Sequence, residues 1–292
     1  MLLSTQTQRL QNKFGYEKAF EILKDAGYDA FDLSLFHPVF EGDPLFTDGF
    51  RPFAEKLREH ADRIGIKCNQ SHAPFPTSVG EPEKDEAIYK GTIRAMEIAS
   101  ILGAEYIIVH PKQHMSYRAN AAKLREINIE YYKSLVPYCE KFNINIAVEN
   151  MWQMNPIGNK TIVDSTCSRV GEFCDYIDSV GSDRVKACLD IGHVSLCGED
   201  MSVMIRGLGG RRLKALHVHD TDGYRDLHTL PFTAENDFGL IMKLLAEIGY
   251  EGDLTFEADR FFHNFPVEMY PDVAAFMAKT GRQLIKMFNE AK

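Results

Sequence analysis

Histidines and acidic residues stand at the ends of short apolar segments throughout this sequence. The segments include YIIVH, INIAVE and LKALHVH, which are rich in Val, Ile, Leu or Ala and short enough to be buried strands. The residues in these positions are His72, His110, Glu149, Asp190, His217, His219 and Glu257. A buried strand is not expected to end repeatedly in an uncompensated charge. The pattern therefore predicts that these side chains meet something at a common site.

The chemistry of such a site follows from its charges. Two carboxylates about 4 Å apart repel each other by about 4 kcal/mol at an effective dielectric constant of about 20. A divalent cation removes this repulsion, and histidine with Asp or Glu is a ligand set for zinc, manganese or a similar metal. The sequence therefore predicts a metal site at one end of a set of strands.

The residues before the strands indicate the fold class. Helical patterns run into a Gly and then into a strand at six junctions, as in ADRIGIKCNQSH, and Asn143 takes the place of Gly in CEKFNINIAVE. Gly and Asn both tolerate the left-handed conformation that follows a helix end. With a first strand near Leu3–Leu10, these junctions predict eight parallel strands alternating with helices. This α/β pattern favours a (β/α)8 TIM barrel, whose active site lies at the C-terminal ends of the strands.

The alternative fold is an open, doubly wound sheet. No G-x-G-x-x-G loop opens the first helix to support it. The least regular stretches are residues 36–52, 74–82, 151–164 and 221–236, and each follows a strand end. We expect them to be loops that build a pocket.

Composition fits one barrel domain spanning residues 1–292, since barrels of this size are single units. No apolar stretch is long enough for a membrane span, and the six cysteines form no C-x-x-C pair, which indicates free thiols in a reducing cytoplasm. The net charge of −9 disfavours a generic nucleic-acid partner. We therefore expect a cytoplasmic protein whose partner is a small molecule rather than a membrane. The oligomeric state stays open, with a homo-oligomer as one form.

Seven short motifs occur in a characteristic order. They are HAPF at His72, VHP at His110, AVEN at Glu149, LDIGH at Asp190, HVHDTDG at His217, DLH at Asp226 and FEAD at Glu257. In this order the chain resembles the xylose isomerase-like TIM barrel superfamily. Its members include sugar-phosphate isomerases and epimerases, ketose 3-epimerases, hydroxypyruvate isomerase, inosose dehydratase and endonuclease IV.

The resemblance implies one divalent ion, Mn²⁺, Zn²⁺ or Mg²⁺, held by Glu149, Asp190, His217 and Glu257. His219 is the alternative to His217, because residues two apart on a strand point to the same side. We prefer His217, which stands three residues before Asp220, as the ligand does in related H-x-x-D patterns.

Further histidines and acids match positions that hold additional zinc ions in endonuclease IV. This set implies either a centre of two or three zinc ions or side chains that bind a sugar substrate and orient the ligands. With Trp152 as a wall for a sugar ring, the expected substrate-binding residues are His72, His110, Trp152, His193, His219, Asp226 and His228.

The implied activity is isomerisation or epimerisation of a sugar, sugar phosphate or polyol through an enediolate. Glu149 and Glu257 would share the roles of general base and acid, with the metal stabilising the developing negative charge. The alternatives are a multi-zinc phosphodiesterase like endonuclease IV, a dehydratase of a cyclic polyol and a non-catalytic sugar-binding barrel.

Two departures from the family patterns bear on the choice among these activities. His110 is followed by PKQH instead of an N-P-G-S-like turn, and DLHTLPFTAEND lacks G-E-G. The first change removes backbone donors suited to phosphate, which disfavours DNA repair.

Overall fold

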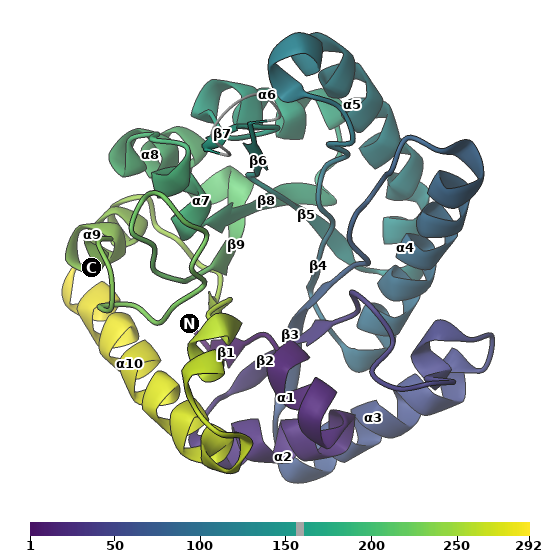
Figure 1. The fold of residues 1–292 in the computed structure, drawn as a ribbon, viewed down its shortest axis with the longest axis vertical. Helices are drawn as coiled ribbons and strands as arrows, with labels where there is room; N and C mark the ends of the chain where they lie inside the picture. Colours follow the sequence, from purple (N-terminus) through teal and green to yellow (C-terminus); the bar gives the residue numbers. More distant parts are fainter. Residues whose placement is uncertain (156–160) are drawn as a thin grey trace.

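Eight parallel strands form a closed ring at the centre of the molecule (Figure 1). The computed structural model describes residues 1–155 and 161–292. The barrel strands are β1 (Leu3–Thr5), β2 (Ala30–Ser34), β3 (Lys67–His72), β4 (Tyr106–Ile108), β5 (Asn145–Glu149), β8 (Val185–Asp190), β9 (Leu213–His217) and β10 (Leu254–Phe256). Six of them form one sheet in the order β2-β3-β4-β5-β8-β9, and β1 pairs with β10. Isolated parallel bridges, from Gln6 to Asp32 and from Val218 to Phe256, join the two sheets and close the ring. The predicted α/β barrel is confirmed.

Helices cover the outside of the ring (Figure 1). They are α2 (Tyr16–Ala26), α3 (Phe50–Ile64), α4 (Pro82–Leu102), α5 (Tyr117–Phe142), α6 (Val170–Val180), α8 (Met201–Arg212), α9 (Phe238–Glu247) and α10 (Tyr270–Glu290). Helices α2, α3, α4 and α6 each end at a Gly with left-handed backbone. Asn143 ends α5 in the same conformation, with φ of 51°. The helix ends predicted at these five junctions are therefore present.

The first strand is shorter than its sequence pattern indicates. It stops at Thr5, Gln6 adds a single parallel bridge to Asp32, and helix α1 (Gln8–Phe14) takes the last three residues of the stretch expected to be extended. The Gln11 backbone N–H donates to the Thr7 carbonyl at 2.8 Å, and the Thr7 hydroxyl donates to the Gln11 side chain at 2.6 Å. These bonds turn the chain into a helix immediately above the ring, so the expected strand from Leu3 to Leu10 is wrong beyond Thr5.

Several loops above the ring contain short elements. Helix α7 (Ile191–Leu196) begins directly where β8 ends, and strands β6 (Trp152–Met154) and β7 (Ile162–Asp164) form an antiparallel pair in a stretch expected to be irregular. Residues 156–160 of that stretch lie outside the described residues. Short 3-10 turns complete the set: η1 (Pro44–Phe46), η2 (Asp259–Asn264) and η3 (Val267–Met269).

Small side chains fill the ring interior beneath the strand ends. Ile108, Ala147, Cys188 and Ala215 form a buried cluster separate from the main core. Because side chains alternate along a strand, Ala147 lies under Glu149, Cys188 under Asp190 and Ala215 under His217. The interior of the ring is therefore filled by apolar side chains, and the polar side chains lie at the C-terminal ends of the strands, as expected for a barrel of this kind.

The cysteines and helices agree with a compact α/β protein. All six cysteines have free thiols, and all except Cys174 are buried. Within the two described ranges, no helix has both the length and the apolar character needed to cross a lipid bilayer.

Candidate metal centre

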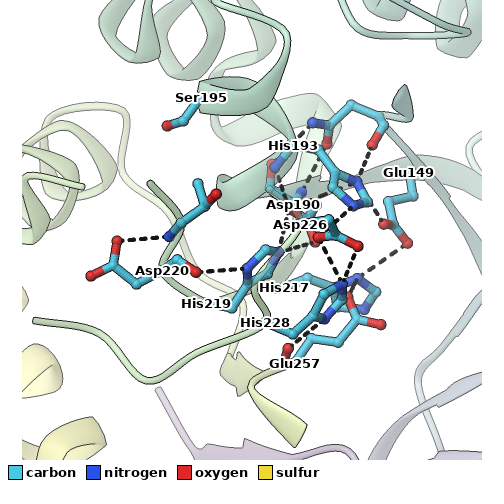
Figure 2. Close-up of polar contacts among 12 residues, drawn as sticks. Glu149, Asp190, His193, Ser195, His217, His219, Asp220, Asp226, His228 and Glu257 are labelled. Carbon is cyan, nitrogen blue, oxygen red and sulfur yellow. Dashed lines mark hydrogen bonds and ion pairs between the residues drawn. The ribbon is translucent and has the colours of Figure 1, made fainter. Parts of the chain in front are cut away.

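Four side chains converge above the ring, one from each of four strand ends. Glu149 ends β5, Asp190 ends β8, His217 ends β9, and Glu257 follows β10 directly. Each offers a ligand atom within 4.8 Å of the others, and all four side chains are buried. The Nδ1 atom of His217 lies 3.1 Å from Oε2 of Glu149 and 3.1 Å from Oε2 of Glu257 (Figure 2). The fold thus brings together the four residues predicted as metal ligands.

The hydrogen bonding of this centre fits a cation. Glu149 Oε2, Glu257 Oε2 and both ring nitrogens of His217 are buried and have no hydrogen-bond partner among the described residues. Buried polar atoms are otherwise almost always hydrogen-bonded, because leaving one unpaired costs about 1–3 kcal/mol. Carboxylate oxygens and an imidazole nitrogen are also ligands of Zn²⁺ and Mn²⁺. A divalent ion would satisfy these atoms together.

The electrostatics lead to the same conclusion. Burial opposes ionisation of Glu149, but the positive charges of His217 and His110 hold the pKa of this carboxyl well below its usual range. Burial likewise opposes ionisation of Glu257, and the charge of His217, whose Nδ1 lies 3.1 Å from Oε2, holds the pKa of Glu257 low. Burial raises the pKa of the Cys188 thiol to about 12, so this thiol stays neutral beside His217. The two carboxylates therefore stay ionised, which is the form that can bind a cation.

Asp190 is fixed by the local structure of the LDIGH motif. Its Oδ1 accepts a 2.7 Å hydrogen bond from the His193 backbone N–H and caps helix α7. Asn150, from the AVEN motif, holds the strand end from the other side: its Oδ1 accepts from the Asp190 N–H at 2.8 Å, and its Nδ2 donates to the Asp190 carbonyl at 3.0 Å. These contacts explain why Asn follows Glu149 and why a helix starts at once after Asp190.

His219 occupies a different position from His217. Its Nε2 lies 3.0 Å from Oδ1 and 3.1 Å from Oδ2 of Asp190, whereas no contact joins it to Glu149 or Glu257 among the described ion pairs. The ring packs so closely on Gly192 that a Cβ atom there would lie 2.0 Å from His219 Cε1. The Gly of LDIGH is therefore required by this contact. The geometry puts His217 in the four-residue centre and His219 behind Asp190.

A second polar cluster consists of His193, His219, Asp226 and His228. His228 Nε2 contacts Asp226 Oδ2 at 3.0 Å, and its Nδ1 donates to the Glu257 carbonyl at 2.8 Å (Figure 2). Burial opposes protonation of His228, but the hydrogen bond to Asp226 raises its pKa to about 9. The His193 Nδ1 donates to the Asn150 carbonyl at 2.8 Å. Most polar atoms of this cluster thus have partners within the protein.

Asp220 organises the loop that carries this cluster. Its carboxylate accepts backbone hydrogen bonds from Thr221 at 2.9 Å, Ala234 at 2.8 Å and Asn236 at 3.0 Å. Both ends of the loop over residues 221–236 are therefore attached to the end of the same strand. This attachment gives the H-x-x-D pattern a structural role.

Asp32 is a site residue that the sequence did not reveal. It lies in the middle of β2, is fully buried, and its carboxylate accepts a 2.8 Å hydrogen bond from Gln70 Nε2. It also contacts Nδ1 of His72, whose ring stacks on His217 at a centroid distance of 4.5 Å. His72 forms further candidate ligand groups, one with Asp32 and His217 and one with His110 and Glu149.

A cavity of about 530 Å³ opens above the centre. Of the predicted substrate-binding residues, those that line it are His110, Trp152, His193, Asp226 and His228. His72 and His219 are fully buried behind it, against Asp32 and Asp190, so their position favours orienting other side chains over touching a ligand. Glu149 and Glu257 both reach the cavity. Lining residues that the sequence did not indicate include Gln6, Arg9, Phe36, Phe75 and Arg260.

The fold and the centre define an α/β barrel with a carboxylate and imidazole site at the C-terminal ends of its strands. The family model described as xylose isomerase-like TIM barrel matches residues 20–280, so the chain belongs to that family. The resemblance drawn from the seven motifs is confirmed.

Similar solved structures share this fold over the full length. A D-tagatose 3-epimerase-like protein is 20% identical with a TM-score of 0.77, and the match covers 99% of both chains. The IolI protein with a bound zinc atom is 17% identical with a TM-score of 0.74, covering 100% of this chain and 99% of that one.

Curated relatives match over shorter regions. The uncharacterized protein MJ1311 of Methanocaldococcus jannaschii is 25% identical over 210 residues, which cover 69% of this chain and 67% of that protein. A probable endonuclease 4 of Bacillus anthracis is 27% identical over 183 residues, covering 59% of this chain and 58% of that protein. The match thus spans about two thirds of the length of the first of these two relatives and less than two thirds of the second.

Proposed function

We propose that this protein is a divalent-metal-dependent isomerase or epimerase of a sugar, sugar phosphate or polyol. The observation that carries the proposal is the pair of buried glutamates, Glu149 and Glu257, which flank His217 and both reach the cavity. They stand on β5 and β10, which are not neighbours in the ring, so they approach a ligand from different sides. Binding alone would not need two such carboxylates.

The reaction would begin with removal of a proton next to a carbonyl group. Glu149, Asp190, His217 and Glu257 would hold the divalent ion, which when bound polarises the substrate carbonyl. Both carboxylates reach the cavity, and the Oε2 atom of each lacks a hydrogen-bond partner among the described residues, so each could accept a proton there. One glutamate would take the proton and the other would return it. Return to the opposite face of the same carbon is epimerisation, and return to the neighbouring carbon is isomerisation.

The other residues around the cavity would position the substrate. His110 and His193 lie beside Glu149, with His110 Nε2 at 3.1 Å from its Oε2, and both line the cavity. Trp152 lines it as well, with its ring edge-on to His193. This combination of hydrogen-bonding groups and an apolar ring suits a polyhydroxylated substrate. The solved D-tagatose 3-epimerase-like protein that shares the fold is named for a reaction of the same class.

The proposal includes one ion rather than two or three. The four-residue centre has several unpaired atoms, whereas His219 and His228 each use both ring nitrogens in contacts with protein oxygens. The second cluster therefore has less need of an ion than the first.

A multi-metal phosphodiesterase is the second candidate. It is favoured by the three further candidate ligand groups: His72 with His110 and Glu149, His72 with Asp32 and His217, and His193 with His219, Asp226 and His228. Several curated relatives are also named probable endonuclease 4. The acidic net charge of −9 counts against a nucleic-acid substrate.

One experiment separates the two candidates. Protein purified without chelator is analysed for metal content and then incubated in deuterated water with a panel of ketoses and aldoses. The proposed function predicts about one divalent ion per chain and deuterium on the carbon next to the carbonyl of a substrate. Two or three zinc ions together with cleavage of an abasic DNA duplex would support the phosphodiesterase. A product lighter by one water would instead indicate a dehydratase.

A further inference from the structure

Two arginines line the cavity from neighbouring loops. Arg9 lies in α1, which follows β1, and Arg260 lies in η2, which follows β10. Because β1 pairs with β10, both arginines come from the same side of the ring. Glu257 and His228 line the cavity on this side too. Arg9 and Arg260 therefore line the same cavity that Glu149 and Glu257 reach.

The hydrogen-bonding capacity of Arg9 is only partly used. Its Nη2 lies 3.4 Å from Oδ2 of Asp259, which is a long contact. Its Nε is buried and has no hydrogen-bond partner among the described residues. A buried guanidinium N–H without an acceptor is costly, and an anionic oxygen is its best partner.

Arg260 also keeps donors for a ligand. Its Nη1 donates to the Asp226 backbone carbonyl, whereas its Nη2 lies 3.6 Å from the Asp226 carboxylate, beyond hydrogen-bonding distance. That carboxylate is instead engaged by His228. The Arg260 side chain is half exposed and free to adjust to a ligand.

The pKa of the nearby His263 is affected by the charges of Arg9 and Arg260. Slight burial and the positive charge of Arg9 lower the pKa of His263, and Arg260 lowers it further, while Asp259 opposes them. At His263 the positive charges of Arg9 and Arg260 thus act together against the charge of Asp259. Phe36, Phe75 and Trp152 add aromatic surface to the cavity. Asp259 and Asp226 lie beside the two arginines, so an anionic group would bind through the guanidinium N–H groups that these acids leave unpaired.

We propose that the substrate carries an anionic group, a carboxylate or a phosphate ester, which binds between Arg9 and Arg260. Its reacting carbons then lie toward Glu149 and Glu257. This inference rests on the proposed function, since it names the substrate class of the same site. Arginine suits the role because its planar, permanently charged fork matches carboxylate and phosphate oxygens.

The test measures binding, not turnover. Metal-loaded full-length protein is titrated by calorimetry with three six-carbon ligands: D-fructose, D-fructose 6-phosphate and 5-keto-D-gluconate. We expect at least one of the charged ligands to bind about tenfold or more tightly than fructose, the usual worth of one charge-assisted hydrogen bond. Arg9→Gln and Arg260→Gln should each reduce that preference by about tenfold and leave fructose binding and metal content unchanged.

Arg206→Gln is the matched control, because Arg206 forms an exposed ion pair with Glu247 on outer helices. It should retain the preference. D-fructose 6-phosphate and 5-keto-D-gluconate distinguish a phosphate ester from a carboxylate. The ligand whose binding is weakened in both arginine variants identifies the anionic group of the substrate. Charged ligands that bind no better than fructose, or not at all, would overturn the inference. The inference would equally fail if both arginine variants still bound the charged ligand more tightly than fructose. It would also fail if, with an abasic DNA duplex added as a fourth ligand, only binding of the DNA were weakened in the arginine variants.

The outcomes for the anion site and for the proposed function are separable. Arginine-dependent binding without deuterium exchange would leave the anion site standing and remove the isomerase. Exchange of neutral ketoses without any arginine dependence would do the reverse.

Discussion

The Nδ1 atom of His72 lies 2.9 Å from Oδ1 of Asp32, and both side chains are fully buried. A carboxylate accepts hydrogen bonds, so this contact assigns the ring proton to Nδ1 and leaves the lone pair on Nε2. That nitrogen has no hydrogen-bond partner among the described residues and lies 3.6 Å from Oε1 of Glu257. Asp32 therefore determines that the Nε2 atom of His72, and not Nδ1, points toward Glu257 in the candidate metal centre.

Replacing Asp32 by Asn should release His72 from this tautomer. We expect turnover or metal affinity to fall about 10–100-fold, as when other buried partners of site histidines are removed. The measurement is a double-mutant cycle with Asp32→Asn and His72→Gln. Independent, additive losses would show that Asp32 does not act through His72.

Replacing Asp190 by Ala should abolish metal binding. Wild-type protein should gain about 2.7 kcal/mol of stability when the ion is present at about 100 times its Kd, and the variant should gain none. Unfolding with and without a chelator, combined with elemental analysis, measures both effects. Asp226→Asn is the comparison, because Asp226 belongs to the second cluster. Loss of metal from both variants would contradict a single-ion centre.

Replacing either Glu149 or Glu257 by Gln should lower turnover by about 10²–10⁴-fold, the usual contribution of a positioned acid or base. Glutamine keeps the shape and one oxygen, so the fold and part of the metal affinity should persist. Steady-state kinetics on an active ketose measure the effect, with Glu130→Gln as control, because the Glu130 side chain is exposed on helix α5. Full activity in either site variant would rule out the two-glutamate mechanism.

Replacing Gly192 by Ala should disturb the site through the backbone. The new Cβ would lie 2.0 Å from the His219 ring, which is fully buried against Asp190. Overpacking of this kind costs about 1–3 kcal/mol, and displacement of His219 should also weaken metal binding. Gly171→Ala, in helix α6 with no atom within 4 Å of the added Cβ, should leave both unchanged. Equal stability of the two variants in urea unfolding would refute the contact.

The pair Asp29 and Arg282 should stabilise the protein in a pH-dependent way. A hydrogen bond from Arg282 lowers the pKa of Asp29, burial opposes this, and the Leu3 backbone N–H adds to the lowering. A lowered folded-state pKa contributes stability above the unfolded value of about 4, and the contribution disappears as the pH falls through the folded value. Arg282→Ala should therefore cost at most about 1 kcal/mol at pH 7, because both side chains are partly exposed, and less at about pH 3. A loss that is equal at both pH values would contradict the pairing.

Much of the barrel could be predicted because its signals are local. A Gly or Asn after a helix and a charge at the end of an apolar run are visible within a few residues, and they located the strand ends that carry Glu149, Asp190 and Glu257. Asp32 escaped detection because it lies inside β2, where an acid could face either the interior or the solvent. The expected strand to Leu10 failed because hydrogen bonds around Thr7 start a helix.

Arg9 and Arg260 could not be assigned from the sequence for a different reason. They are about 250 residues apart and become neighbours only because β1 pairs with β10 when the ring closes. The choice between His217 and His219 also depended on which ring meets the glutamates, since alternation along a strand gives both the same side. Such relationships are properties of the closed barrel rather than of any segment.

The closure of the ring has a consequence for how this architecture diversifies. Glu149, Asp190 and His217 stand on one continuous sheet, whereas Glu257 follows β10, part of a two-stranded sheet that isolated bridges connect to the rest. The loops bearing Arg9 and Arg260 grow from that same pair of strands. Mutations in the β1–β10 strand pair and its loops disrupt few backbone hydrogen bonds of the six-stranded sheet. That sheet holds Glu149, Asp190 and His217. Changes in the loops that carry Arg9 and Arg260 can therefore alter the surroundings of Glu257 while the sheet that holds Glu149, Asp190 and His217 keeps its strand pairing.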